Sequence, residues 1–145
     1  MTPGEWIEYS KRIIYKSGYK YQLVESCLYQ TKIHPRNDID VPYISLRKDG
    51  LLFVKAAYAW DGPSGMTIDT KSFMRGSLIH DALYQLIRMG YLELTDRAQA
   101  DKELYTICLE DGMCKIRAWY VYQCVKQFAQ FAALPKNKKR LQDAP

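Results

Sequence analysis

The sequence predicts an α+β fold in which an N-terminal antiparallel β-sheet packs against a C-terminal three-helix unit. From residue 19 to residue 33, hydrophobic residues recur with a period of two, which is typical of half-buried strands. From residue 72 onward they follow the helical period, with breaks at Gly90 and Gly112. Because strands fill one part of the chain and helices the other, we expect the two kinds of element to be segregated.

The strand region begins with the alternation at residues 19–33, which predicts a strand pair or one long bent strand. Asp49-Gly50 is a typical two-residue hairpin turn after a strand at residues 43–48. Residues 51–60 are almost entirely apolar, which favours a central strand covered on both sides. The predicted buried face of the first stretch comprises Tyr19, Tyr21, Leu23, Cys27, Tyr29, Thr31 and Ile33.

Three helices are expected in the second half of the chain. The first covers residues 72–89 and the second covers residues 96–111, and the short link between them makes them antiparallel neighbours. The third helix carries a wide apolar face whose aromatic stripe we expect in the core. That face comprises Ile116, Trp119, Tyr120, Cys124, Phe128 and Phe131.

The chain of 145 residues is long enough for one domain with a hydrophobic core, which we assign to residues 1–135. Residues 136–145 are expected to form a flexible basic tail. The net charge of +5 favours phosphate-bearing or anionic-lipid partners through long-range attraction. Nucleic-acid binding through this charge is the weakest of the functional hypotheses.

Several sequence features limit the class of protein. No apolar run approaches the length of a transmembrane segment, and no basic region followed by an apolar run marks a signal peptide. The cysteines show no Cys-x-x-Cys pairing, and we expect reduced thiols in a cytoplasmic protein. The sequence contains neither a Gly-rich phosphate loop nor a Gly-x-Ser-x-Gly elbow. The four cysteines are Cys27, Cys108, Cys114 and Cys124.

Candidate chemistry is concentrated around His80, which lies in the first predicted helix. Asp81 follows it directly, Tyr84 lies one turn later, and Asp101 lies on the apolar side of the next helix. A buried acid needs a partner, and on an antiparallel neighbour His80 is within reach of Asp101. A histidine held by a carboxylate can act as a general base, because the carboxylate fixes the tautomer and stabilises the imidazolium. The same residues also admit a purely structural role as a satisfied buried pair.

The segment Asp61-Gly62-Pro63-Ser64-Gly65 predicts a tight loop between the last strand and the His80 helix. Consecutive helix residues diverge by roughly 100°, so Asp81 should point to a different neighbour than His80 does. If the loop lies there, its carbonyls and Asp81 form an oxygen-rich site that suits Ca²⁺. The ion would polarise an ester carbonyl while the histidine activates water. An ordinary strand-to-helix connection is the alternative. The predicted ligands are Asp81, Asp61, Gly62 and Ser64.

Two resemblances follow from these residues. The stretch from Trp60-Asp61-Gly62-Pro63-Ser64 through His80-Asp81-Ala82-Leu83-Tyr84 to Ala100-Asp101 resembles the DUF1353 family of bacteriophage and prophage proteins. The resemblance covers roughly residues 51–128 and supplies no established activity. It implies a phage origin, with the host cytoplasm or the virion as the location and other phage structural proteins as partners.

The core His-Asp-x-x-Tyr, followed by Ala-Asp on the next helix, is similar to secreted and viral phospholipases A2. That resemblance implies that His80 is the base, that Asp101 orients it and that Tyr84 is a supporting hydrogen-bond donor. It also implies that Asp81 binds Ca²⁺ together with the backbone of the preceding loop. The sequence departs from the phospholipase pattern in lacking a Gly-x-Gly core in that loop and the disulfides of the secreted enzymes.

These observations predict two functions of different classes. The first is a calcium-assisted ester hydrolase resembling phospholipase A2, which acts on phospholipid or another ester. The alternative is a non-catalytic phage accessory protein or a virion-associated structural or binding protein of the tail or capsid. In that protein the same polar cluster holds two helices together.

Overall fold

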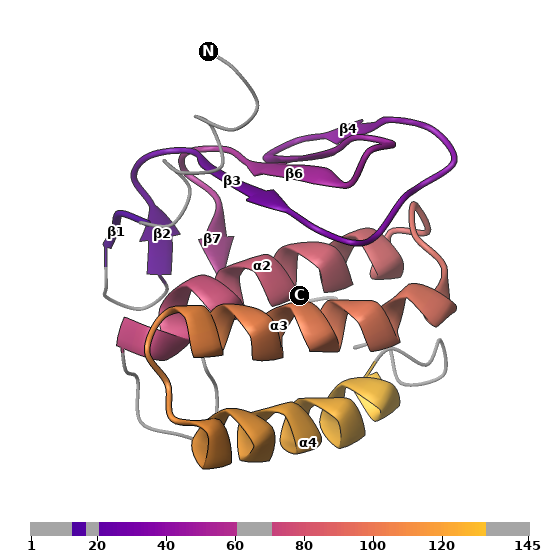
Figure 1. Cartoon of the computed structure of the whole chain (residues 1–145). Helices are drawn as coiled ribbons and strands as arrows, with labels where there is room; N and C mark the ends of the chain where they lie inside the picture. The colour runs from indigo at the N-terminus through magenta and orange to yellow at the C-terminus, as the bar shows by residue number, and fades with distance from the viewer. Residues whose placement is uncertain (1–12, 17–20, 61–70, 133–145) are drawn as a thin grey trace, which may run out of the picture.

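The computed structural model describes residues 13–16, 21–60 and 71–132 (Figure 1). In these ranges the N-terminal half forms antiparallel β-structure and the C-terminal half forms three helices, which confirms the predicted α+β class. The predicted loop at residues 61–65 and the basic tail at residues 136–145 lie outside the described residues.

The described strands form two small antiparallel sheets. The three-stranded sheet has the order β1 (Tyr15–Lys16), β2 (Tyr21–Leu23), β7 (Ala59–Trp60), and the four-stranded sheet has the order β3 (Cys27–Gln30), β6 (Leu51–Val54), β5 (Ile44–Leu46), β4 (Ile39–Val41). In the larger sheet β6 is central, so that Leu52 lies opposite Tyr29 on one side and Leu46 on the other.

The alternating stretch at residues 19–33 is divided between the two sheets. A bend at residues 24–26 separates β2 from β3, so the stretch bends as one alternative predicts but forms two strands that are not paired with each other. The described part of the predicted face is buried or partly buried on both sides of the bend, although Leu28 on the opposite face is buried as well. The buried members are Leu23, Cys27, Tyr29, Thr31 and Ile33, and Tyr21 is partly buried. Tyr19 lies outside the described residues.

Residues 51–60 do not form a single strand as predicted. β6 ends at Val54, and Ala57 takes a positive φ of 77°. The Ala57 N–H donates to the Leu23 carbonyl at 2.7 Å, and the Leu23 N–H donates to the Tyr58 carbonyl at 2.8 Å. These bonds draw the chain out of the larger sheet and into β7 of the smaller one.

The three helices lie where the sequence predicts them. Gly90 and Gly112 follow α2 and α3 with φ of 85° and 96°, a left-handed conformation that costs glycine little. The helices are α2 (Lys71–Arg88), α3 (Arg97–Glu110) and α4 (Lys115–Ala132), and a short 3₁₀ turn, η1 (Leu94–Asp96), precedes α3.

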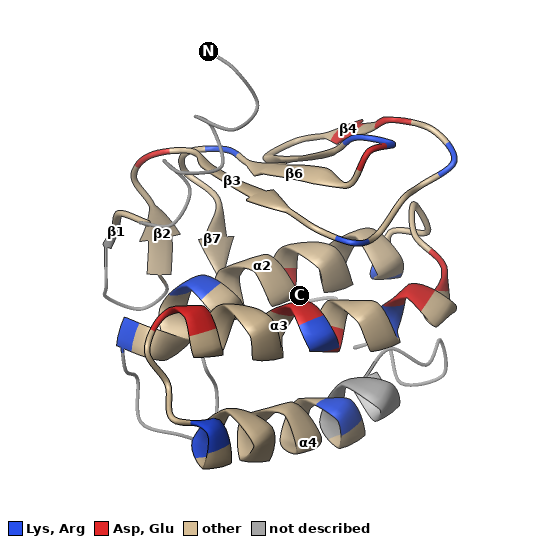
Figure 2. Cartoon of the chain, viewed as in Figure 1, with Lys and Arg blue, Asp and Glu red and all other residues tan. Residues whose placement is uncertain are grey.

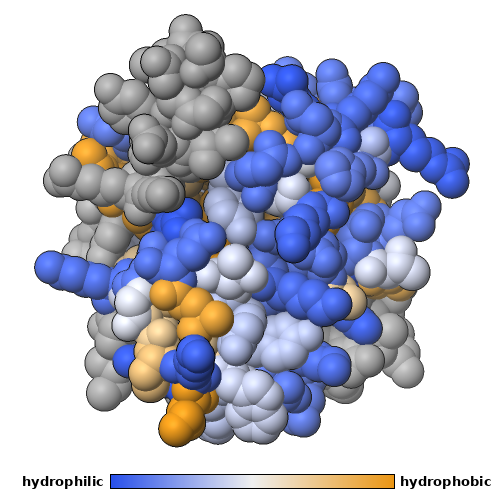
Figure 3. Space-filling view, viewed as in Figure 1, coloured by the Kyte–Doolittle hydropathy of each residue, from blue (hydrophilic) through white to orange (hydrophobic). Residues whose placement is uncertain are grey.

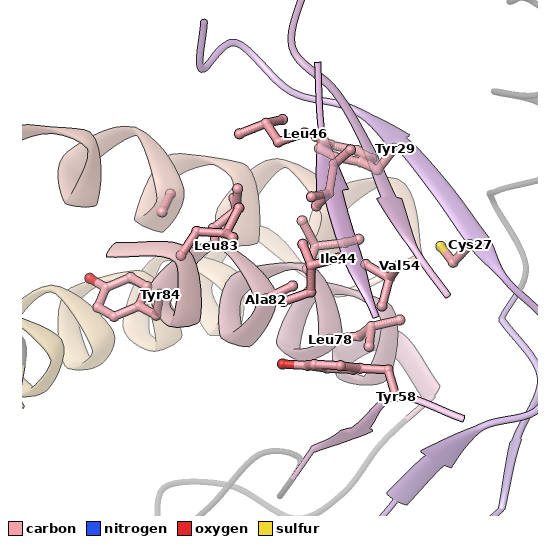
Figure 4. Packing of buried hydrophobic residues seen from close by; sticks show 14 of the residues in the cluster. Cys27, Tyr29, Ile44, Leu46, Val54, Tyr58, Leu78, Ala82, Leu83 and Tyr84 are labelled. Carbon is pink, nitrogen blue, oxygen red and sulfur yellow. The ribbon is translucent and has the colours of Figure 1, made fainter. Parts of the chain in front are cut away.

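The elements form layers in which the larger sheet lies over α2 and α3, and α4 lies on the far side of α3 (Figure 1). Leu78 and Ala82 of α2 are fully buried and face Ile44 and Val54 of the sheet (Figure 4). The main hydrophobic cluster joins the sheets to α2 and α3. A smaller cluster joins α3 to α4.

The helices α2 and α3 approach closely at Gly76. A Cβ atom there would lie 2.7 Å from Leu104 Cδ1 and 3.2 Å from Cys108 Sγ, which are both buried. A larger side chain would therefore displace core atoms. The close approach lies one turn before His80 and brings that histidine near the neighbouring helix.

The prediction of which face of the third helix is buried is wrong. Ile116, Trp119 and Tyr120 are 84%, 57% and 53% exposed. The helix packs instead through small and β-branched side chains on its opposite side, which allow close contact with α3. Cys124 is only partly buried, and the side chains of Phe128 and Phe131 lie outside the described residues. The buried residues of α4 are Ala118, Val121 and Val125.

None of the four cysteines forms a disulfide, in agreement with the reduced thiols that the sequence predicts. Burial raises the pKa of Cys27 and of Cys108 to about 12, so both are unreactive thiols at neutral pH. Among the described residues, no helix combines the length and the hydrophobicity that crossing a bilayer requires.

Candidate active site

The facing sides of α2 and α3 bring together His80 and Asp101. His80 Nε2 lies 2.8 Å from Asp101 Oδ1, and the two residues are 8% and 2% exposed. This contact confirms the pairing that the sequence predicts. Helical periodicity places each side chain on the apolar side of its helix, and the short connection sets the two helices antiparallel.

Tyr84 completes the cluster from the next turn of α2. Its hydroxyl donates to the same oxygen, Asp101 Oδ1, at 2.7 Å, and its ring centroid lies 4.3 Å from that of His80. An ionised carboxylate only accepts hydrogen bonds, so His80 Nε2 carries a proton when Asp101 is charged. In the neutral imidazole the acceptor nitrogen is then Nδ1.

The electrostatics of the cluster favour a charged imidazolium. Burial lowers the pKa of His80, but the hydrogen bond to Asp101 and the charges of Asp101 and Asp81 outweigh it and raise the pKa above its usual value. Burial and the Asp101 carboxylate raise the pKa of Tyr84 far beyond its usual value. Tyr84 therefore stays a neutral hydrogen-bond donor across the physiological range.

Asp81 lies near the second imidazole nitrogen of His80, and the loop that it was predicted to face lies outside the described residues. Asp81 Oδ1 is 3.9 Å from His80 Nδ1, which is too long for a direct hydrogen bond. Its side chain is 36% exposed, compared with 2% for Asp101. The Nδ1 atom of His80 therefore faces the more accessible of the two carboxylates.

Of the predicted calcium ligands, the structure describes Asp81, while Asp61, Gly62 and Ser64 lie outside the described residues. Within residues 13–16, 21–60 and 71–132, no group of three or more His, Cys, Asp or Glu residues could hold a metal ion.

A hydrogen bond that the sequence does not predict anchors β7 beside the cluster. The buried indole of Trp60 donates from Nε1 to Ser77 Oγ at 3.1 Å, and the Ser77 hydroxyl donates to the Met74 carbonyl at 2.8 Å. Ser77 lies three residues before His80 on α2. Trp60, the last described residue before the predicted loop, is thus fixed to the helix that carries the histidine. No sequence pattern links these two positions.

Two cations near Tyr84 were also missed. Arg88 and Arg97 are close enough to lower the pKa of its hydroxyl, against the larger effects of burial and Asp101. Arg88 follows Tyr84 by four residues, and this helical spacing predicts that both side chains lie on the same side of α2. Both add positive potential beside the His80 cluster.

A second buried acid of the described region, Glu103, has hydrogen-bond donors at both of its carboxylate oxygens. Glu103 accepts hydrogen bonds from the Tyr29 hydroxyl at 2.7 Å, the Lys32 N–H at 2.8 Å and Gln99 Nε2 at 2.9 Å. The His80 cluster differs from this arrangement, because Nδ1 has no hydrogen bond to another described side chain and faces a half-exposed acid. It is therefore the best candidate for chemistry.

Comparison of the chain with protein-family models, curated proteins and solved structures finds no match. The resemblances to the DUF1353 family and to phospholipases A2 therefore stay predictions from the quoted residues.

Proposed function

We propose that this protein hydrolyses an ester, with His80 as general base, Asp101 as the acid that orients it and Tyr84 as a supporting donor. The observation that carries the proposal is the pair of short hydrogen bonds on Asp101 Oδ1, from His80 Nε2 at 2.8 Å and Tyr84 at 2.7 Å. They hold the imidazole in the orientation that directs Nδ1 toward Asp81. The resemblance to phospholipases A2 makes phospholipid or another ester the expected substrate.

In the proposed reaction, His80 Nδ1 removes a proton from a water molecule as the water oxygen attacks the ester carbonyl. Asp101 stabilises the imidazolium that forms, and Tyr84 holds the carboxylate in place. The imidazolium then returns the proton to the departing alkoxide as the carbon–oxygen bond breaks. General acid–base catalysis of this kind contributes about 10²- to 10⁴-fold to a rate.

Two cations beside the cluster favour an anionic ester. Arg88 and Arg97 are near enough to Tyr84 to lower its pKa, and they offset part of the negative charge of Asp101 and Asp81. Positive potential beside a site raises the local concentration of an anionic substrate. A phospholipid carries such a charge on its phosphate.

The test is release of fatty acid from mixed phospholipid vesicles, with and without Ca²⁺. We expect His80→Gln to lower the rate by about 10²- to 10⁴-fold, and Asp101→Asn to lower it through loss of imidazolium stabilisation. His34→Gln is the matched control, since this exposed histidine hydrogen-bonds only the Lys48 carbonyl among described residues and should keep full activity. Unchanged hydrolysis in His80→Gln would contradict the proposal.

The calcium prediction has its own experimental arm. If Asp81 binds the ion together with the predicted loop, a chelator and Asp81→Asn should each abolish the calcium-dependent part of the rate. If neither the chelator nor Asp81→Asn changes the rate of hydrolysis, calcium has no role in the reaction, and the proposed role of His80 is unaffected.

The second candidate is a non-catalytic phage accessory or virion-associated protein. The deep burial of His80, Tyr84 and Asp101 favours it, because a satisfied polar cluster can simply join α2 to α3. In that case His80→Ala lowers the melting temperature markedly, and neither it nor the wild type releases fatty acid. An unaffected melting temperature would count against this candidate.

A further inference from the structure

The helix α4 has two apolar faces, and one of them is exposed. Ala118, Val121 and Val125 are at most 7% exposed and pack in the cluster with α3. On the opposite side lie Ile116, Trp119 and Tyr120, which are 84%, 57% and 53% exposed. We call these three residues the outer face of α4. Their spacing of three and four residues places them side by side on the helix surface.

The outer face lies in a strongly basic part of the chain. Lys115, Arg117 and Lys126 are the charged residues of α4, which contains no Asp or Glu. Figure 2 shows blue and no red along this helix, while α3 carries both colours. Residues 115–145 contain seven Lys or Arg and one Asp, a net charge of +6. Residues 1–114 contain 14 Lys or Arg and 15 Asp or Glu, a net charge of −1.

The space-filling view shows how these properties combine. Hydrophobic and weakly polar atoms gather at the lower edge of the molecule, over the beginning of α4, with hydrophilic atoms beside them (Figure 3). Exposed apolar groups bordered by charge are typical of an interaction site. The excess of positive charge favours an anionic partner.

We propose that the outer face of α4 binds the surface of a bilayer that contains anionic lipid. Trp119 and Tyr120 have the amphipathic rings that favour the headgroup region, and Ile116 supplies a side chain for the acyl boundary. Lys115 and Lys126, both exposed, lie on the same flank of the helix and would contact lipid phosphates. The helix would lie parallel to the surface without entering the bilayer core.

The same observations argue against two other partners. A second copy of the chain would bring two basic helices together, and their like charges would repel. A single nucleic-acid strand is bound in a basic groove by stacking on aromatic rings, whereas this face is the convex side of a helix. Its most exposed side chain is Ile116, which has no ring on which a base could stack.

The test is flotation of the full-length chain with phosphatidylcholine vesicles, with and without phosphatidylglycerol. We expect binding to the mixed vesicles, little binding to pure phosphatidylcholine, and weaker binding as salt is added. The double variants Ile116→Ser/Trp119→Ser and Lys115→Glu/Lys126→Glu should each lower the vesicle partition coefficient about tenfold or more. Circular dichroism would check that both variants are folded.

Matched controls come from other exposed positions. Tyr91 is 51% exposed at the turn between α2 and α3, and Lys102 is exposed on α3. Tyr91→Ser and Lys102→Glu should bind vesicles like the wild type. His80→Gln should also bind like the wild type, so a failure of the proposed hydrolysis is distinguishable from a failure of this binding.

Three outcomes would overturn the proposal. Equal binding to pure phosphatidylcholine would show that anionic lipid is not recognised. If both α4 double variants bind vesicles like the wild type, another part of the chain, such as the basic residues 136–140, is responsible for the binding. Self-association or retention of a single-stranded oligonucleotide that depends on Trp119, without vesicle binding, would assign the face to a different partner.

Discussion

Asp101 is the residue on which the candidate site depends. One of its oxygens accepts hydrogen bonds from His80 and Tyr84, while the residue is only 2% exposed. A buried carboxylate is tolerated when it is hydrogen-bonded and costly when it is not. The same acid therefore stabilises the fold and determines the protonation and orientation of the His80 ring. Activity and stability measured on the same variants would separate these two roles.

The raised pKa of His80 predicts a pH dependence of stability. Asp101 and Asp81 favour the imidazolium in the folded state more than burial opposes it, so the folded pKa lies above the ordinary value of 6.5. The resulting stabilisation is fully present below the unfolded pKa and is lost as the pH rises through the folded pKa. Tyr84 does not titrate in this window, because its pKa is raised from 10.

Urea unfolding at a series of pH values between about 5.5 and 8.5 would measure the effect. The difference in the free energy of unfolding between wild type and His80→Gln should be largest at the acidic end and shrink as the pH rises. A difference that grows with pH or stays constant would show that His80 is not stabilised as an imidazolium. Hydrolysis should show the opposite trend and rise with pH, since a base must be unprotonated.

At the scale of the elements, a second buried acid joins the helices to the sheet. Glu103 lies on α3 and binds the Tyr29 hydroxyl on β3 and the Lys32 N–H just after it. Arg75 of α2 lies with its guanidinium 5.8 Å from the centroid of the Tyr29 ring and makes two hydrogen bonds with Asp111. These contacts fix the helical pair under the sheet while the His80 cluster fixes α2 to α3.

Replacing Glu103 by Ala tests this connection. The change removes three hydrogen bonds and leaves the buried Tyr29 hydroxyl and the Lys32 N–H without their acceptor. We expect a loss of about 2–4 kcal/mol in the free energy of unfolding. Lys102→Ala, at the exposed neighbouring position, should change it by less than about 0.5 kcal/mol. Equal effects of the two substitutions in urea unfolding would show that the Glu103 contacts contribute little.

At the scale of the whole molecule, α3 is shared by two hydrophobic clusters. Its residues Ala100 and Ile107 belong to the cluster with the sheets and α2. Leu104 and Cys108 belong to the cluster with α4. Because one helix contributes to both, unfolding of either cluster should destabilise the other, as expected for a single domain.

Two probes would check this cooperativity. In a Trp6→Phe/Trp119→Phe variant, fluorescence reports the buried Trp60 of the smaller sheet, while far-ultraviolet circular dichroism reports mainly the helices. The two denaturation curves should coincide. A circular dichroism transition that precedes the loss of Trp60 burial would show that helical structure unfolds separately from the smaller sheet.

The sequence by itself determined the fold class, the positions of the helices and the pairing of His80 with Asp101. Each of these follows from local periodicity, from glycine at the helix ends and from a short connection between two helices. The buried face of residues 19–33 was likewise readable, because alternation fixes which side chains share a side of the chain. Such features depend on neighbours a few residues apart.

Only the tertiary structure decided how the strands are divided between two sheets and which face of α4 is buried. The helix has apolar residues on opposite sides, around Val121 and around Trp119, so its pattern is compatible with either orientation. Packing against α3 selected the side with the smaller residues. The partners of Trp60 and Glu103 are equally invisible in the sequence, because their contacts join residues 17 and 74 positions apart. Contacts at such separations are set by the geometry of the assembled core.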